Sequence, residues 1–434
     1  MKKLTYLWTL LILAALVITL IFVIPFERSN PKSVSSVEWQ LHLGTMFRDI
    51  GYGLSILDES RVLIAGWTTK ENSEFTDDQD VYLAEISSAG ELLWERRLGG
   101  SKSDGASGIC STKDGGIIVV GSTWSTDGDV TNNHGQQDVW VLKFNKNRDL
   151  EWEKTFGGSD VETAFDVQQV SDGGYIFVGY TKSQDGDVGK NHGQEDIWIV
   201  KLSESGEIEW ERTFGGSSWD NAYSVCETHD KGYIVVGFTF SDDGDVKEKH
   251  ESADYWVLRL NNNGEMLWQK CLGGNNWDQA FSVVETDDKG FAVLGTTWSD
   301  NVDESRGAGD YWLVKLSETG EIKWSKRFGG SNDDIGAEIL QTEDKGFIIC
   351  GATWSYDGDV SGKHGGSDYW VVKTDSQGNL QWQTCLGDDM DEIAYGIQKV
   401  KSTEYVVSGI SYSPVMGIKA RSHGGGDIWV VKLR

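Results

Sequence analysis

Two tryptophans beside acidic residues are the side chains of this sequence best suited to bind a ligand. Trp219 precedes Asp220, and Trp277 precedes Asp278 at an equivalent position 58 residues later. Phe240 and Trp298 each follow 21 residues after one of these tryptophans. Aromatic rings next to carboxylates are how proteins hold sugar rings or basic side chains. The predicted ligand-binding residues are therefore Trp219, Asp220, Phe240, Trp277, Asp278 and Trp298.

A second set of candidate ligands lies in the motif Asp-Gly-Asp-Val, which occurs four times, each time with a histidine downstream. Two carboxylates separated by one residue can chelate Ca²⁺ together with loop carbonyls and water. A complete calcium loop has more oxygen ligands than this, so the motif also fits an Asx turn in which the histidine bonds a carboxylate. The candidate metal ligands are Asp127, Asp129, Asp185, Asp187, Asp243, Asp245, Asp357 and Asp359.

Composition and charge exclude several classes of function. The chain has 434 residues, 38% of them hydrophobic, so it can bury a sizeable core. A net charge of -29 repels phosphate backbones, which excludes nucleic acid as a partner. There is no GxSxG elbow, no HExxH and no phosphate-binding loop, so no catalytic residue is predicted.

The positions of these candidates are set by an internal repeat that runs from residue 37 to the C-terminus. Seven tryptophans recur at intervals of 55 to 58 residues: Trp39, Trp94, Trp152, Trp210, Trp268, Trp324 and Trp382. A glycine column and an Asp-x-aromatic column run in phase with them. Residues present in all seven copies are predicted to serve the fold.

Each copy contains four short apolar or alternating segments separated by turn residues. In the copy after Trp210 they are 220–227, 233–239, 255–260 and 266–272, and Asp/Asn-Gly turns join the first pair and the last pair. No helical period of useful length follows residue 26. Seven four-stranded units predict an all-β fold, a seven-bladed β-propeller.

The repeat also resembles known repeats. Its unit reads W-x4-GG-S-x2-D-x-A, then T-x-D-x-G-[YF], then G-x-T-W-S-x-DGDV, then HGxxD-x-W-V-V-K-L. It is similar to propeller repeats of secreted and surface bacterial proteins and, more distantly, to quinoprotein-type repeats, over residues 37–434. The resemblance implies that the strand after GG-S-x2-D is innermost. The segment 37–43 would then complete the seventh blade beside 428–433 and close the ring.

One face of such a propeller carries the loops leading into the inner strands and the long loops with the Asp-Gly-Asp-Val motifs. An acid stands at the mouth of each inner strand, which predicts either a ring attracting cations or a set of turn caps, with turn caps favoured. Trp219 and Trp277 depart from the repeat, because other copies have Arg48, Ser103, Val161, Asp333 or Asp391 there. Packing between blades is the alternative interpretation for the aromatics.

The N-terminus predicts a membrane anchor. Lys2 and Lys3 precede an apolar run at 4–26 that is long enough to span a bilayer. We expect a cytoplasmic stub at 1–3, a transmembrane signal-anchor at 4–26, a linker at 27–36 and the propeller at 37–434 on the extracytoplasmic side of the cell membrane. A cleaved signal peptide is the alternative and would give a secreted protein.

These features predict a cell-surface recognition module that binds a glycan or protein ligand on its long-loop face. An enzyme is the alternative, either a quinoprotein-like oxidoreductase or a polysaccharide hydrolase or lyase, and so is a purely structural surface module. The inner positions read as acidic or small, which disfavours a quinone cofactor bearing carboxylates. We expect no cofactor other than Ca²⁺, and contact with the membrane only through the N-terminal helix.

Overall fold

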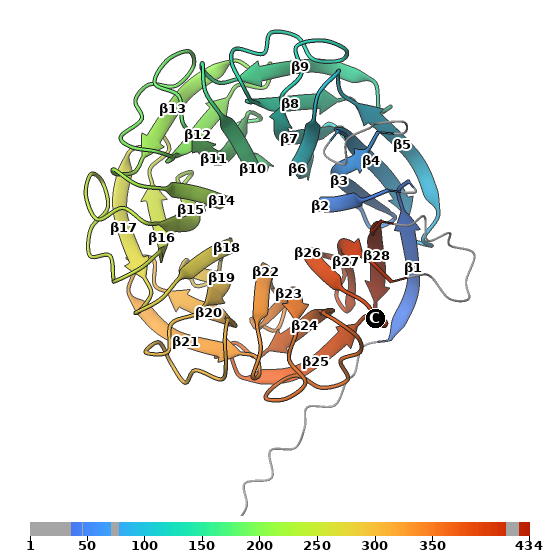
Figure 1. Ribbon diagram of the computed structural model, residues 1–434, viewed down its shortest axis with the longest axis vertical. Coiled ribbons are helices and arrows are strands. Elements are labelled where there is room, and N and C mark those ends of the chain that lie inside the picture. Colours follow the sequence, from blue (N-terminus) through green and yellow to red (C-terminus); the bar gives the residue numbers. More distant parts are fainter. Residues whose placement is uncertain (1–35, 46, 71–77, 414–424) are drawn as a thin grey trace, which may run out of the picture. The chain divides into compact units, whose positions relative to one another are not determined.

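The computed structural model describes residues 36–45, 47–70, 78–413 and 425–434. In this part of the chain, 28 strands form seven four-stranded antiparallel sheets (Figure 1). The predicted cytoplasmic stub and signal-anchor, and nearly all of the predicted linker, lie outside the described residues. Among the residues that are described, no helix has the length and hydropathy needed to span a bilayer.

The first three blades follow one another along the chain. Blade 1 contains β2 (Asp49–Asp58), β3 (Arg61–Thr69), β4 (Gln79–Ser87) and β5 (Leu92–Leu98). Blade 2 contains β6 (Asp104–Ser111), β7 (Ile117–Thr123), β8 (Asp138–Phe144) and β9 (Leu150–Phe156). Blade 3 contains β10 (Glu162–Gln169), β11 (Tyr175–Thr181), β12 (Asp196–Leu202) and β13 (Ile208–Phe214).

The next three blades have the same order. Blade 4 contains β14 (Asp220–Glu227), β15 (Tyr233–Thr239), β16 (Asp254–Leu260) and β17 (Met266–Leu272). Blade 5 contains β18 (Asp278–Glu285), β19 (Phe291–Thr297), β20 (Asp310–Leu316) and β21 (Ile322–Phe328). Blade 6 contains β22 (Asp334–Gln341), β23 (Phe347–Thr353), β24 (Asp368–Thr374) and β25 (Leu380–Leu386).

Blade 7 is built from both ends of the propeller sequence. β26 (Glu392–Lys401), β27 (Glu404–Ser411) and β28 (Asp427–Leu433) pair in order, and β1 (Val37–Leu43) pairs antiparallel with β28. The register joins Leu43 to Ile428 at one end and Val37 to Leu433 at the other. The predicted closure by the N-terminal strand is confirmed.

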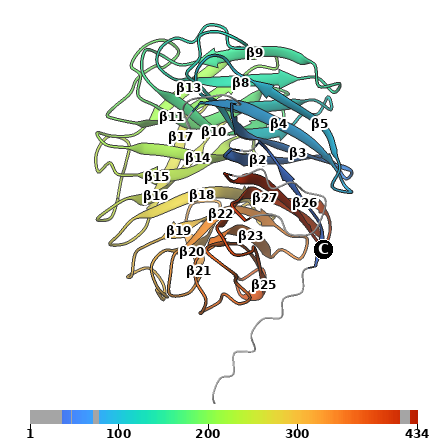
Figure 2. The same ribbon diagram turned by 45° about the vertical axis from the view of Figure 1, so that its right-hand side comes forward.

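The blades surround a central axis with their first strands innermost, as Figures 1 and 2 show. The apolar core lies between neighbouring blades. One cluster, for example, joins Ile176 and Val178 of blade 3 to Val235 and Trp256 of blade 4. Third strands such as β12 are buried along their whole length, whereas outer strands such as β13 are only partly buried. The predicted seven-bladed propeller of four-stranded blades is confirmed.

In six of the seven blades the third strand begins with a buried aspartate that needs compensation for its charge. In blade 1, Asp80 is the second residue of β4 and is only partly buried. In blade 2 the Asp138 carboxylate accepts the amide of His134 at 2.8 Å and contacts its ring Nδ1 at 2.6 Å. Blades 3, 4 and 6 repeat this arrangement with His192, His250 and His364. The histidine therefore serves the fold in these blades.

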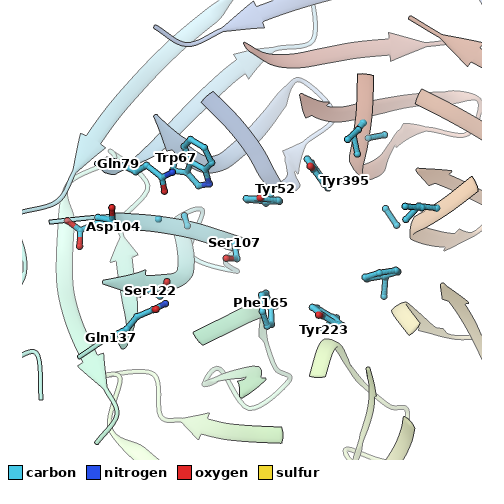
Figure 3. A pocket seen from close by; sticks show the side chains of 18 of the residues that line it. Tyr52, Trp67, Gln79, Asp104, Ser107, Ser122, Gln137, Phe165, Tyr223 and Tyr395 are labelled. Carbon is cyan, nitrogen blue, oxygen red and sulfur yellow. The ribbon is translucent and has the colours of Figure 1, made fainter. Parts of the chain in front are cut away.

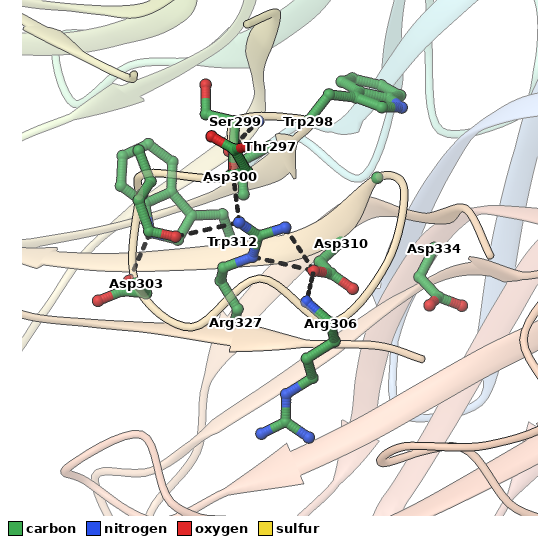
Figure 4. Close-up of polar contacts among 12 residues, drawn as sticks. Thr297, Trp298, Ser299, Asp300, Asp303, Arg306, Asp310, Trp312, Arg327 and Asp334 are labelled. Atoms are coloured by element: carbon green, nitrogen blue, oxygen red, sulfur yellow. Dashed lines mark hydrogen bonds and ion pairs between the residues drawn. The ribbon is translucent and has the colours of Figure 1, made fainter. Parts of the chain in front are cut away.

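In blade 5 an arginine, in place of a histidine, pairs with the buried aspartate (Figure 4). Arg306 occupies the histidine position, yet its guanidinium contacts Asp359 of blade 6. Arg327 of β21 pairs with Asp310 instead, its Nε lying 2.9 Å from Oδ2, and both side chains are at most 1% exposed. The Arg327 guanidinium also donates to the Val302 carbonyl at 3.0 Å. Burial still raises the pKa of Asp310, so this carboxylate depends on its arginine.

Candidate functional site

The two predicted sets of loops lie on one face of the ring, because they hydrogen-bond to each other. In blade 2, Asp127 Oδ1 accepts the amide of Ser101 at 2.7 Å and Asp129 Oδ2 accepts the amide of Gly99 at 3.1 Å. The same pair of bonds recurs at Asp185 and Asp187, and again at Asp243 and Asp245, while Asp357 accepts the amide of Ser331. The Asp-Gly-Asp-Val loop thus packs against the loop that leads into the inner strand.

These bonds bear on the predicted calcium sites. The motif carboxylates already accept backbone amides, and in the described ranges no three histidine, cysteine or acidic residues are grouped so as to hold a metal. Calcium binding by these loops stays a hypothesis, and the alternative interpretation as turns is the one that we expect to hold. We expect a chelator to leave the unfolding temperature unchanged within the error of calorimetry, because a cation would compete with amide donors that are in place. A clear drop in that temperature would assign calcium to the loops.

The seven acids at the mouths of the inner strands are structural. Asp49, Asp104, Glu162, Asp220, Asp278, Asp334 and Glu392 are at most 1% exposed. Asp220 accepts the Gly216 amide at 2.8 Å and the Ser241 hydroxyl at 2.7 Å, and Asp278 makes the equivalent bonds. Burial raises the pKa of both aspartates. The expectation that Asp220 and Asp278 face a ligand is therefore corrected: they cap turns beneath the surface.

The four predicted aromatic residues do come together, and we call them the aromatic patch: Trp219, Phe240, Trp277 and Trp298. Ring centroids are 5.8 Å apart for Trp219 and Phe240, 5.7 Å for Phe240 and Trp277, and 6.0 Å for Trp277 and Trp298. The amide of Phe240 bonds the Trp219 carbonyl, and that of Trp298 bonds the Trp277 carbonyl. The repeat geometry thus aligns rings from blades 4 and 5 in a row.

The members of the aromatic patch differ in how far their side chains are exposed. Trp219 is 45% exposed and Trp277 is 43% exposed, and the rings in contact with them belong mostly to the patch itself. Phe240 is only partly exposed, and the Trp298 indole donates to Asp333 of blade 6 at 2.9 Å. Packing between blades therefore explains the buried part of the Trp298 side chain. It does not account for the exposed faces of Trp219 and Trp277.

Sequence analysis missed a second group of residues, one per blade, at the axis of the ring. The ladder between first and second strands shifts register in every blade, for example between Ala164 and Asp166 and between Ala222 and Ser224. The residue skipped at each shift is Tyr52, Ser107, Phe165, Tyr223, Phe281, Ala337 or Tyr395. All seven are partly exposed, and Figure 3 shows Tyr52, Phe165, Tyr223 and Tyr395 pointing into the axial space.

These skipped residues correct the expectation that inner positions are acidic or small. Five of the seven are aromatic, and their rings pack in tilted pairs in two groups: Tyr52 with Tyr395 at 4.7 Å between ring centroids, and Tyr223 with Phe165 at 4.8 Å and with Phe281 at 5.3 Å. They line a cavity of about 610 Å³ that extends toward Trp67 (Figure 3). One feature of the sequence could have indicated these residues. The position three residues after each capping acid varies from copy to copy, whereas the positions around it repeat.

Comparison with known proteins adds a likeness of fold. No protein-family model matches the sequence, and no curated protein matches it either. Similar solved structures include a protein of unknown function from Bacteroides caccae, 17% identical with a TM-score of 0.42, over 75% of this chain and 93% of that chain. Quinohemoprotein alcohol dehydrogenase from Comamonas testosteroni is 11% identical with a TM-score of 0.48, over 92% and 76% of the two chains.

Puromycin hydrolase is 10% identical with a TM-score of 0.49, over 83% of this chain and 50% of that chain. A quinoprotein dehydrogenase is therefore among the similar structures. No finding supports the relationship to secreted or surface repeats. At these identities the likeness concerns the fold and leaves function to the site.

Proposed function

We propose that this propeller is a recognition module whose long-loop face binds a glycan through the aromatic patch. The observation that supports this most is the exposure of Trp219 and Trp277 at a position where the other copies of the repeat have no aromatic residue. A blade folds without tryptophan there, so packing does not explain it. Exposed rings beside polar loops are the usual means of stacking on sugars.

The row of rings in the aromatic patch favours an extended ligand. Trp219 and Trp277 come from adjacent blades and flank Phe240, so successive sugar rings of one chain can stack on them. The aromatic patch has a polar rim, because Asn275 and Asn276 are exposed next to Trp277. Aromatic faces with hydrogen-bonding neighbours suit a neutral polysaccharide better than an anionic one, given the net charge of -29.

The proposal includes a location. The apolar run at 4–26 would tether the propeller to the cell membrane and place it on the extracytoplasmic side, where glycans are abundant. Fusion of a reporter protein to the C-terminus, followed by protease treatment of intact cells, tests this. The account expects the reporter to be cleaved, and full protection would contradict it.

A glycan array probed with the full-length protein tests the function, with a peptide array probed in parallel. We expect binding to neutral oligosaccharides of at least two sugar units and none to single sugars. Binding confined to peptides would replace the glycan with a protein ligand. Binding to neither array would contradict recognition by this face.

A further inference from the structure

Two carboxylates at the axis of the ring have no cationic partner among the described residues. Asp166 follows Phe165 on β10, and Glu338 follows Ala337 on β22. Both line a second axial cavity of about 140 Å³. The five axial aromatic residues, Tyr52, Phe165, Tyr223, Phe281 and Tyr395, line this cavity as well as the larger one. The rings therefore lie between the carboxylates and the larger cavity.

The hydrogen bonds of these carboxyl groups come from neutral donors only. Asp166 Oδ2 accepts the Val225 amide at 3.0 Å. Glu338 accepts the Ile397 amide at 2.5 Å and the Gln398 side-chain amide at 2.8 Å. Burial raises the pKa of Asp166 to about 6, and burial together with the nearby Asp166 charge raises that of Glu338 to about 8. Burial is the main cause of both shifts, and no cation lies close enough to offset it.

We propose that the axial channel binds an organic cation, with its ammonium group among the aromatic side chains and neutralised by Asp166 and Glu338. An alkylammonium group is attracted to aromatic faces, which supply no oxygen ligands to a bare metal ion. The rest of such a ligand fits in the larger cavity, where Trp67, Ile335 and Ile393 provide apolar walls. Aromatic rings with adjoining carboxylates select an amine over a neutral molecule of equal shape.

This site is separate from the proposed glycan site. None of the four residues of the aromatic patch lines either axial cavity. Substitutions in the patch and at the axis therefore give independent readouts. The two proposals can fail separately.

Calorimetric titration of the full-length protein with choline and with 3,3-dimethylbutanol, its neutral counterpart of similar shape, tests the cation site. We expect choline to bind at least about tenfold more tightly, a difference of about 1.4 kcal/mol. Equal affinity for the two compounds, or no binding of choline at millimolar concentrations, would overturn the proposal.

Substitution of the carboxylates locates the effect. Asp166→Asn with Glu338→Gln keeps oxygen acceptors for the backbone amides and removes two ionisable carboxyl groups that have no cationic partner, so the ring should fold. We expect choline affinity to fall about tenfold or more. Glu59→Gln with Glu91→Gln removes two exposed acids and should leave affinity unchanged, as should Trp219→Ala with Trp277→Ala. Undiminished binding by the first variant would also refute the site.

Discussion

Deletion of residues 33–45 is expected to destabilise the whole ring. The deletion removes β1, and with it Trp39, Leu41 and Leu43, which pack in the cluster between blades 7 and 1. The Trp39 indole also donates to the Ser88 carbonyl of blade 1 at 2.8 Å, so β1 joins the last blade to the first. Because truncating one large buried side chain costs about 2–5 kcal/mol, we expect the loss to exceed about 5 kcal/mol. The exposed edge of β28 should also promote aggregation.

Thermal unfolding of two truncated chains checks this expectation. Removal of residues 1–32 alone leaves β1 in place and serves as the matched control, because it should keep the unfolding temperature of the propeller. A chain lacking 33–45 that unfolds at the temperature of the control would refute closure by β1.

Replacement of Arg327 by threonine is expected to cost about 3–5 kcal/mol, because it leaves the buried Asp310 carboxylate without its cation. Threonine is the appropriate substitute, since Thr155 and Thr213 occupy the equivalent positions in blades 2 and 3. Those blades tolerate threonine because a histidine four residues before the aspartate pairs with it. Chemical denaturation measures the loss.

A second substitution should rescue this loss. The backbone amide of Arg306 already bonds Asp310, as the histidine amides do in other blades. Adding Arg306→His to Arg327→Thr therefore rebuilds the pair of blade 2, and we expect recovery of at least about half of the lost free energy. Arg306→His alone should have a small effect. Absence of rescue would show that Arg327 acts through its bonds to loop carbonyls.

The fold could be predicted from the sequence because every blade repeats the same pattern of residues. Trp39 and Trp382 begin and end the same column, so the single strand left over at the start and the three strands at the end were recognisable as parts of one blade. The repeat also separated Trp219 and Trp277 from structural residues without any relative to compare. Residues that recur in every copy are required for the fold of a blade, and residues that depart from the repeat are not.

The chemistry of the capping acids and of the axis was harder to predict. Asp220 stands beside an exposed tryptophan in the sequence, yet the turn of the chain buries its carboxylate under Gly216 and Ser241. Tyr223 was missed because side chains of a regular strand point to alternate faces, and this rule does not foresee a register shift. The shift between Ala222 and Ser224 of β14 turns Tyr223 toward the axis. Alternation predicts which face a side chain takes only while the ladder is regular.

The most direct test of the recognition function is a binding isotherm for a glycan selected on the array, measured with Trp219→Ala plus Trp277→Ala and with Tyr356→Ala. Tyr356 is 65% exposed on a loop of blade 6 and serves as the control for loss of an exposed ring. The account predicts that the double variant loses binding while its unfolding temperature stays near that of the parent, and that Tyr356→Ala binds normally. Retained binding, or a loss of several kcal/mol in stability, would contradict it.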